Sequence, residues 1–263
     1  MIERYLFVSL ILAFIPSQAF CQSEQLVINA AQISRPGLLT FENPKGSIKV
    51  TGYDGDVILV TGTLRFRDAE KTDENGMRRI VQNPVDISAE VNGNNVTILC
   101  SSTGKTVDFD IKIPRDFSLK LKSLDNGIVD IVNINGEIEV ENTDGDILLA
   151  NISGSAVLSS VYGKISAVFR EADPDKPMMF TSFEGDVIIT LPGTVNASLK
   201  MRTDRGEILS DFEIKPAKRL PVVKNVENTR IYSLEDWVTG TINAGGPEYI
   251  IRSYDGDIFL RKK

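Results

Sequence analysis

Apolar and polar residues alternate along most of the chain, and glycine resets the alternation at regular intervals. Within residues 126–169, glycine stands at every ninth position, at Gly127, Gly136, Gly145, Gly154 and Gly163. The second and fourth residues after each glycine are apolar, and the residues between them are mostly polar or small. Such period-two alternation is typical of a strand with one buried face. The pattern predicts a series of short strands with these residues inside: Val129, Ile131, Ile138, Val140, Ile147, Leu149, Ala156, Leu158, Ile165 and Ala167.

A second, longer repetition surrounds two prolines. Alternating apolar residues precede and follow Pro114, and the same arrangement returns around Pro192. A glycine stands 13 residues after the first proline and 14 after the second, at Gly127 and Gly206. Internal repetition of this kind indicates one structural unit used many times. Proline cannot donate a hydrogen bond to a neighbouring strand, so each proline is expected at a strand end or corner.

The remaining segments also favour strands and turns over helices. Residues 25–33 predict an entry strand, and residues 85–99 predict a hairpin that turns at Asn92-Gly93. Two segments depart from the repeat, a charged excursion at 65–83 and a proline-containing one at 215–236. No sustained apolar pattern has a helical period. The chain is therefore predicted to be all-β, with at most one short helix in an excursion.

Two all-β architectures agree with the nine-residue period. In a parallel β-solenoid, each unit forms one side of a coil, and equal positions of successive coils lie above one another. In an antiparallel meander or sandwich, each glycine lies in a hairpin turn. We favour the solenoid, because antiparallel neighbours would not require the same residue type at the same place in every unit. The solenoid predicts that equal positions are all buried, for example Val129, Ile138, Ile147, Ala156 and Ile165.

Composition narrows the chemistry that is open to the protein. The chain has 263 residues, 42% of them hydrophobic and 25% charged, which is ordinary for a globular protein that folds without metal or disulfide support. Its net charge of −7 argues against nucleic acid as the main partner. The absence of histidine excludes Ser-His-Asp and Cys-His catalysis and histidine-ligated metal sites. No cofactor is expected, and Cys100 is expected to be a buried core thiol.

The N-terminus has the features of an export signal. A basic residue precedes an apolar run at 6–15, and small residues follow the run. The run is shorter than the roughly 20 residues that span a bilayer. We therefore expect a signal peptide at residues 1–21 and a single repetitive β domain at 22–263, with no transmembrane span after the signal is removed. Cleavage fits best after Ala19, and modification of Cys21 by lipid is the alternative.

A turn with two acids around a glycine occurs four times almost unchanged. Aspartate and glycine are common turn residues, which is sufficient to explain the motif. Paired carboxylates in loops could also bind calcium, although the tandem Gly-Gly-x-Gly-x-Asp of calcium-binding nonapeptide repeats is absent. We expect a structural role and regard the acids as candidate calcium ligands only. They are Asp54, Asp56, Asp144, Asp146, Glu184, Asp186, Asp255 and Asp257.

A catalytic role can be considered for the same acids, because stacked coils align carboxylates and paired acids cleave glycosides. No basic or aromatic partner recurs at a fixed distance from them, so no catalytic residue is assigned. Aromatic rings stand just ahead of a turn glycine at Tyr53, Tyr162, Phe183 and Tyr254. We expect these rings to cover the core rather than to stack on sugar. The basic residues 261–263 are expected to keep the last strand from pairing with other chains.

Taken together, these stretches resemble a known family. The resemblance is carried by residues 110–127, by the glycine series described above, by 191–208 and most strongly by 240–261. Over residues 40–263 the chain resembles the bacterial putative-adhesin family of β-strand repeats, a domain of unknown function. The resemblance implies an exported, right-handed β-solenoid with an adhesive or cell-envelope role. It implies no functional residues, because none is defined in the family.

The sequence thus predicts an exported, non-enzymatic protein of the periplasm, the outer-membrane surface or the extracellular space. It would bind a macromolecule of the cell envelope, protein or glycan, through its surface, and an exposed end of the solenoid could add a partner's strand. The alternative is a carbohydrate-binding or polysaccharide-cleaving solenoid. A cleft lined by exposed aromatics and acids across several coils would favour this alternative, and uniformly polar faces of small residues would favour a scaffold.

Overall fold

The computed structural model describes residues 23–65, 85–101, 104–216, 221–226, 229–234 and 236–263. In this part of the chain the regular structure is β, apart from a single 3₁₀ turn, η1 (Ala30–Gln32). The all-β prediction is therefore confirmed. The expected signal peptide, Cys21 and almost all of the charged excursion at 65–83 lie outside the described residues.

All of the described strands except β18 and β19 belong to one continuous sheet. The strands are numbered in the order of the sequence. They are β1 (Ser23–Asn29), β2 (Leu38–Asn43), β3 (Ile48–Tyr53), β4 (Val57–Leu64), β5 (Ile87–Asn92), β6 (Asn95–Cys100), β7 (Val107–Pro114), β8 (Ser118–Ser123), β9 (Val129–Val132), β10 (Asn135–Asp144), β11 (Ile147–Tyr162), β12 (Ile165–Ala172), β13 (Met178–Glu184), β14 (Val187–Leu191), β15 (Ala197–Thr203), β16 (Ile208–Ser210), β17 (Lys215–Pro216), β18 (Pro221–Val226), β19 (Thr229–Leu234), β20 (Val238–Ile242), β21 (Glu248–Asp255) and β22 (Ile258–Lys262).

Successive nine-residue units lie in opposite rows of parallel strands. Val129 in β9 pairs with Ile147 in β11, which pairs with Ile165 in β12, so each partner lies 18 positions further along the chain. In the other row, Ile138 in β10 pairs with Ala156 in β11, again 18 positions away. A glycine turn between units carries the chain from one row to the other. One complete turn of the repeat therefore uses two units.

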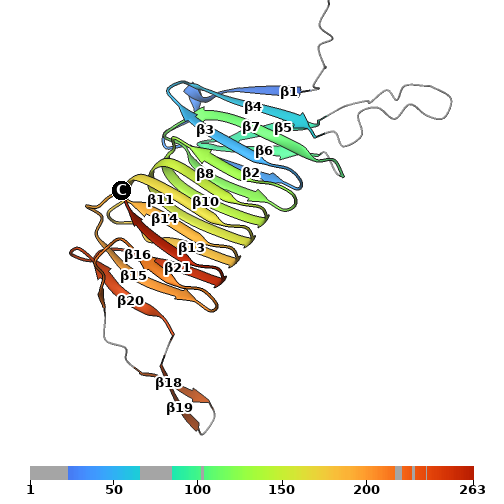
Figure 1. Cartoon of the computed structure of the whole chain (residues 1–263). Helices are drawn as coiled ribbons and strands as arrows, with labels where there is room; N and C mark the ends of the chain where they lie inside the picture. The colour runs from blue at the N-terminus through green and yellow to red at the C-terminus, as the bar shows by residue number, and fades with distance from the viewer. Residues whose placement is uncertain (1–22, 66–84, 102–103, 217–220, 227–228, 235) are drawn as a thin grey trace, which may run out of the picture.

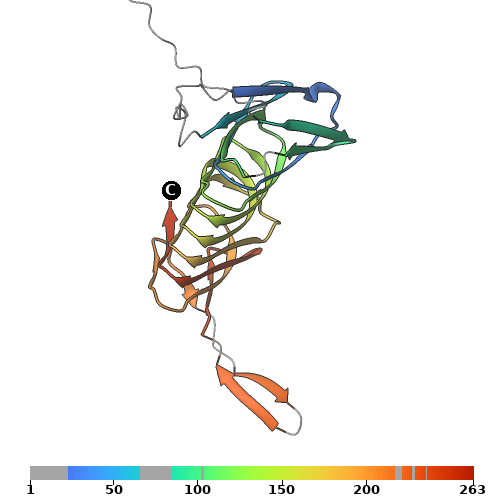
Figure 2. The same cartoon turned by 90° about the vertical axis from the view of Figure 1, so that its right-hand side faces the viewer.

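The two rows run side by side along the length of the stack, from β1 and β4 at one end to β15 and β20 at the other (Figures 1 and 2). The first row contains β7, β3, β9, the first half of β11, β12, β14, β22 and β16 in spatial order. The second row contains β6, β2, β8, β10, the second half of β11, β13, β21 and β15.

Antiparallel strands occur mainly at the ends of this stack. β4 and β1 extend the first row beyond β7, β5 extends the second row beyond β6, and β20 with β17 follow β15. The remaining antiparallel pair is the β18–β19 hairpin, which pairs with no other described strand. The alternative of an antiparallel meander therefore does not describe the glycine repeat.

The core lies between the two rows. The five equal positions Val129, Ile138, Ile147, Ala156 and Ile165 are each no more than 2% exposed. The prediction that these positions are buried is confirmed. Burying one isoleucine or leucine side chain stabilises a fold by about 1.5–3 kcal/mol, so these stacked columns of apolar side chains are the main source of stability.

A strand pair near each end of the described chain is inserted into the interior of the stack. The N-terminal pair β2 and β3 lies between β6–β7 and β8–β9, and the C-terminal pair β21 and β22 lies between β13–β14 and β15–β16. Pro114 ends β7 and Pro192 follows β14, at the two places where the chain steps over the inserted pair. The long-range repetition around these prolines is thereby explained.

The expectation for the basic residues 261–263 is wrong in part. β22 is hydrogen-bonded to β14 on one side, and Ile258–Leu260 are also paired with β16 on the other, so this part of β22 is interior, whereas β16 does not reach Arg261 and Lys262. The sequence suggested an edge because β22 ends the chain, but the order of strands in space differs from their order in the sequence.

Two predicted local elements are confirmed, and one detail is corrected. The entry strand is β1, and the hairpin at 85–99 consists of β5 and β6, with Gly93 in the left-handed region at φ 62°. Cys100 is half-buried rather than buried, because it lies at the end of β6.

The inserted C-terminal pair provides a direct test of the strand order. Deleting residues 248–263 removes the neighbour of β13–β14 and of β15–β16 at once, and we expect the truncated chain to lose its cooperative thermal transition. Replacing residues 221–234 by a short glycine-serine linker removes only the separate hairpin and should leave the melting temperature nearly unchanged. Circular dichroism melts of both variants check this. Equal melting of the 248–263 deletion and the full chain would contradict the strand order.

Candidate functional site

Glycines form a column along one corner of the stack, where the chain passes from the second row to the first. In spatial order they are Gly46, Gly127, Gly145, Gly163, Gly185, Gly256 and Gly206. We call these seven glycines, with the two residues before and the one after each, the glycine corner.

Successive glycines of the corner touch each other's backbone. A Cβ atom built on Gly145 would lie 2.2 Å from the carbonyl oxygen of Gly127, and one on Gly163 would lie 2.2 Å from that of Gly145. The same distance is 2.5 Å for Gly185 and 2.4 Å for Gly256. Gly145 also has a φ of 124°, which side chains disfavour. The corner can therefore close only with glycine in each turn.

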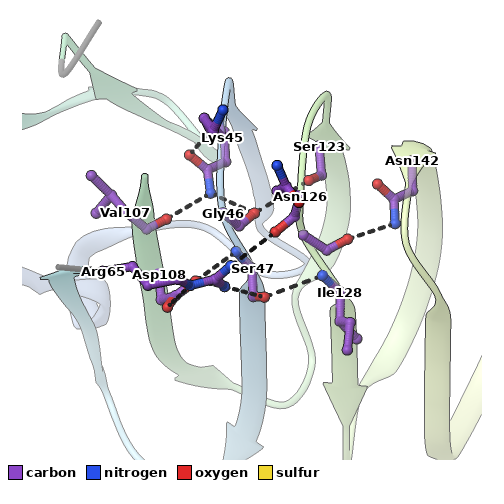
Figure 3. Close-up of polar contacts among 12 residues, drawn as sticks. Lys45, Gly46, Ser47, Arg65, Val107, Asp108, Ser123, Asn126, Ile128 and Asn142 are labelled. Atoms are coloured by element: carbon purple, nitrogen blue, oxygen red, sulfur yellow. Dashed lines mark hydrogen bonds and ion pairs between the residues drawn. The ribbon is translucent and has the colours of Figure 1, made fainter. Parts of the chain in front are cut away.

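A column of buried polar side chains supports the glycine carbonyls from inside. Asn142 Nδ2 donates to the carbonyls of Gly127 (2.9 Å) and Gly145 (2.8 Å). Ser182 Oγ donates to Gly163 (3.1 Å) in the same way. The members that stand three residues before a glycine are Asn43, Asn142, Ser160, Ser182, Thr203 and Ser253, and Ser123 occupies the same place one residue earlier. Figure 3 shows Ser123 and Asn142 beside the glycine turns.

The sequence analysis missed this polar column, although a signal for it was present. The sixth residue after Gly136 is Asn142, which continues the inward parity of Ile138 and Val140. A small hydrogen-bonding residue at that inward place, repeated three positions before a glycine, predicts a buried bond to the turn.

The column is interrupted between Asn142 and Ser160, which lie opposite each other in adjacent strands. Both are buried, and neither Asn142 Oδ1 nor Ser160 Oγ has a hydrogen-bond partner. If Ser160 behaved like Ser182, its hydroxyl would donate to the carbonyl of Gly145. Asn142 donates to that oxygen instead. Leaving a buried polar group unpartnered costs about 1–3 kcal/mol.

Three of the candidate calcium ligands belong to a second, outer set of backbone bonds. Asp146 accepts from the backbone N–H of Lys164 (3.0 Å), and Asp186 accepts from that of Asp257 (2.9 Å). Asp257 in turn accepts from Glu207 N–H (2.8 Å). The acid that directly follows the glycine therefore ties one turn to the next, as the structural interpretation of the motif requires.

The other five candidates lie on the surface, where Glu184 and Asp255 are neighbours in adjacent strands. Asp54 lies 2.7 Å from Arg115 Nε, Asp56 lies 3.6 Å from Arg35, and Asp255 lies 3.5 Å from Arg205. The remaining two are Asp144, which is half-exposed, and Glu184, which is exposed. Within the described ranges, no three groups of metal-binding type come together, and the calcium hypothesis stays a hypothesis.

The expectation that the aromatic residues ahead of the glycines cover the core is wrong for two of them. Tyr162 is 51% and Phe183 is 47% exposed. Phe183 stacks on Tyr254 with ring centroids 4.8 Å apart and an angle of 1° between the planes, and the Arg205 guanidinium lies 5.2 Å from the Tyr254 centroid. Phe183, two positions before its glycine, faces outward because the position three before the glycine faces inward, whereas Tyr162 directly precedes Gly163 at the end of β11.

Tyr53 behaves differently, because its turn leads into the antiparallel strand β4. Its ring is half-buried, and its hydroxyl donates to the carbonyl of Val57 at 2.6 Å. It therefore closes its own turn instead of joining the exposed rings.

Arg65 fastens the start of the charged excursion to the glycine corner (Figure 3). Its guanidinium donates to both carboxylate oxygens of Asp108, to Ser47 Oγ (3.2 Å) and to the carbonyl of Asn126 (3.2 Å). The hydrogen bond to Asp108 raises the pKa of Arg65 above its ordinary value. Asp108 also accepts from the backbone N–H of Ser47 (2.9 Å), so this cluster is a structural clamp.

The glycine corner carries nearly all of the net charge of the chain. It contains nine acidic and three basic residues, a net charge of −6, whereas the whole chain has −7. The acids are Asp125, Asp144, Asp146, Glu184, Asp186, Asp204, Glu207, Asp255 and Asp257, and the bases are Lys45, Lys164 and Arg205. The corner thus combines a rigid backbone, a strongly acidic surface and exposed rings.

Residues 80–261 match the family model described as Toastrack DUF4097. The chain belongs to the Toastrack DUF4097 family. The resemblance to the putative-adhesin family of unknown function is thereby confirmed, although the match begins later than residue 40. No curated protein matches the chain.

Two solved structures are similar to this chain over most of its length. A crystal structure of a putative cell adhesion protein from Clostridium sporogenes is 11% identical, with a TM-score of 0.49, and the match covers 92% of this chain and 100% of that one. A crystal structure of a putative adhesin from Bacteroides fragilis is 13% identical, with a TM-score of 0.41, covering 92% of this chain and 97% of that one.

Tyr249 is fully buried, and its hydroxyl has no hydrogen-bond partner. Burial, with a smaller contribution from the charge of Asp173, raises the pKa of Tyr249 to about 12, so this phenol stays protonated and is a core residue.

The contact between glycines can be tested by adding one methyl group. Gly145→Ala places a Cβ against the Gly127 carbonyl and forces an alanine into a disfavoured φ, and we expect it to cost roughly 3–5 kcal/mol of unfolding free energy. Gly93→Ala is the matched control, because Gly93 also has positive φ but nothing lies within 4 Å of its Cβ position. It should cost about 1–2 kcal/mol. Equal losses in urea unfolding would show that the close contact is not what requires glycine.

The polar column predicts opposite effects for two serines. Ser182→Ala removes the donor to the Gly163 carbonyl and should destabilise the protein by about 1–2 kcal/mol. Ser160→Ala removes a buried hydroxyl that has no partner, so it should be neutral or stabilising. Urea unfolding of the two variants measures the difference. If Ser160→Ala costs as much as Ser182→Ala, the assignment of the unpartnered hydroxyl is wrong.

The raised pKa of Tyr249 predicts that this residue contributes to the loss of stability at alkaline pH. Because its folded pKa of about 12 exceeds the ordinary value near 10, the stability that this group contributes is intact below pH 10 and is lost as the pH rises toward 12. Tyr249→Phe should remove that part of the loss and should not destabilise the protein at neutral pH. Unfolding free energies between pH 8 and pH 11.5 test this, with Tyr162→Phe as the exposed control. An unchanged alkaline slope in Tyr249→Phe would contradict the prediction.

Proposed function

We propose that this Toastrack chain is an exported bacterial protein of the cell surface or envelope that binds a macromolecular partner and catalyses no reaction. The observation that carries the proposal is the glycine corner, where a net charge of −6 and exposed apolar rings lie on a backbone held rigid by glycine contacts and buried hydrogen bonds. A rigid surface loses little conformational freedom on binding, which favours affinity.

We further propose that the repeat is a right-handed parallel β-solenoid with a turn of 18 residues. Parallel pairing between positions 18 apart and the stacked glycines support the solenoid. Right-handedness is supported by the general rule that connections between parallel strands are right-handed, and by the resemblance described above.

Export is proposed from the sequence at the N-terminus. Residues 1–21 have the order of a signal peptide, a basic residue, an apolar run and small residues, and the β domain would occupy 22–263. In the described ranges, no helix combines the length and the apolar character needed to cross a membrane. The mature protein would then reside in the periplasm, on the outer-membrane surface or outside the cell.

A carbohydrate-binding or polysaccharide-cleaving function is the second candidate, favoured by the exposed ring of Tyr162 next to acidic turns. Two features weigh against it. One face of Phe183 and one face of Tyr254 are stacked on each other, and Arg205 lies over the Tyr254 ring, so these faces are not free to stack on a sugar ring. The pocket bordered by Phe41, Lys120 and Glu139 lies on β2, β8 and β10, and none of the acids of the glycine corner lines it.

Fractionation of cells that express the full chain with a C-terminal tag tests the proposal. We expect a mature form without residues 1–19 or 1–20 in the envelope or the medium, detected by mass spectrometry of its N-terminus. A full-length, uncleaved chain in the cytoplasm would overturn the export proposal. Incubation of the secreted form with acidic and neutral polysaccharides tests the second candidate, since clear turnover would overturn the non-enzymatic assignment.

A further inference from the structure

Two exposed columns run side by side over three neighbouring turns of the glycine corner. Two positions before the glycine, Val161, Phe183 and Tyr254 follow one another in adjacent strands. One position before the glycine, Tyr162 pairs with Glu184, which pairs with Asp255. Val161, Tyr162 and Phe183 are 37%, 51% and 47% exposed. An apolar strip therefore lies directly beside a partly acidic one.

The chemistry of these columns limits what they can bind. The net charge of the corner repels nucleic acid and other polyanions. The stacked faces of Phe183 and Tyr254 leave mainly ring edges exposed, which suits contact with aliphatic side chains and carbonyl oxygens better than stacking on sugar. The side-chain carboxylate of Glu184 is exposed and has no hydrogen-bond or ion-pair partner among the described residues, so it is free to accept from a cation.

We infer that the edge formed by Val161, Tyr162, Phe183, Glu184, Tyr254 and Asp255 docks an extended basic polypeptide segment in which lysine or arginine alternates with apolar residues. The inference deepens the proposed function and rests on it. Charge complementarity selects the cationic partner, and the neighbouring apolar column selects a partner that also carries apolar side chains.

The spacing of the columns agrees with an extended partner. Neighbouring turns lie about 4.8 Å apart, and alternate residues of an extended chain lie about 6.6 Å apart. Lysine and arginine have long flexible stems, so two cationic residues on one side of the segment can reach Glu184 and Asp255. The pair of Asp255 with Arg205 is solvent-exposed, at 52% and 63% for the two side chains. Exposed pairs contribute little, so a partner can replace it.

The test uses residues 22–263 and a fluorescent probe peptide, acetyl-(Lys-Val)₆-amide, in anisotropy titrations at low and high salt. We expect binding that weakens with salt. The double variant Glu184→Lys/Asp255→Lys should bind at least tenfold more weakly. The matched control is Glu139→Lys/Glu141→Lys, which changes the net charge equally on the outer face of the second row, and it should bind like the unchanged protein. Circular dichroism confirms the fold of each variant.

A second variant separates the apolar contribution from charge. Phe183→Ser leaves the net charge unchanged and should still lower the affinity for the probe peptide several-fold. Equal affinity in both double variants, tighter binding of a glutamate-for-lysine probe, or preferential binding of neutral glycans would each overturn the inference. Failure of the probe to bind a chain that fractionates with the envelope would refute this inference alone, whereas a cytoplasmic, uncleaved chain that still binds the probe would refute the proposed function.

Discussion

The close approach of the backbone at the glycine corner is the constraint on which the structure depends. Each turn passes so near the one before it that a single methyl group would lie 2.0–2.5 Å from a carbonyl oxygen along the column from Gly127 to Gly206. The opposite corner has a shorter version, where Gly154 meets the carbonyl of Gly136. Because the turns are this tight, equal positions fall above one another, and the apolar columns of the core follow from that alignment.

A rigid corner also explains how the same edge can be both structural and exposed. Inside, Asn142, Ser182 and their equivalents hold the glycine carbonyls. Outside, the acid after the glycine holds the next turn's backbone N–H, as Asp146 does for Lys164. The two outward positions before the glycine take no part in these bonds, so they are free to carry rings and acids, and the surface chemistry is concentrated there.

Much of the fold was predictable because its signals are local. Alternation and glycine spacing indicated the strands and the burial of Val129, Ile147 and Ile165. The pairing over 18 residues was not predictable from the period alone, because a nine-residue unit does not say which row it joins. The insertion of β2–β3 and β21–β22 was not predictable either, because each pair lies between strands that are distant from it in the sequence.

The site was predictable only in part, for a related reason. The acidic turns were recognised, and their structural role is seen in Asp146, Asp186 and Asp257. The aromatic residues were assigned to the core because they are apolar, whereas the parity of the strand places Phe183 outside. Asn142 was given no role in the sequence-based prediction, although it continues the inward parity of its strand.

Cross-linking by engineered cysteines tests the 18-residue alignment most directly, in a chain with Cys100→Ser. Leu148 and Ser166 lie opposite each other on the outer side of adjacent strands, whereas Leu148 and Val157 are nine positions apart in opposite rows. We predict a rapid disulfide for Leu148→Cys/Ser166→Cys, within the Cα separation of roughly 4.4–6.8 Å that disulfides need. Leu148→Cys/Val157→Cys should remain reduced. A disulfide in the nine-residue pair with none in the 18-residue pair would contradict the account.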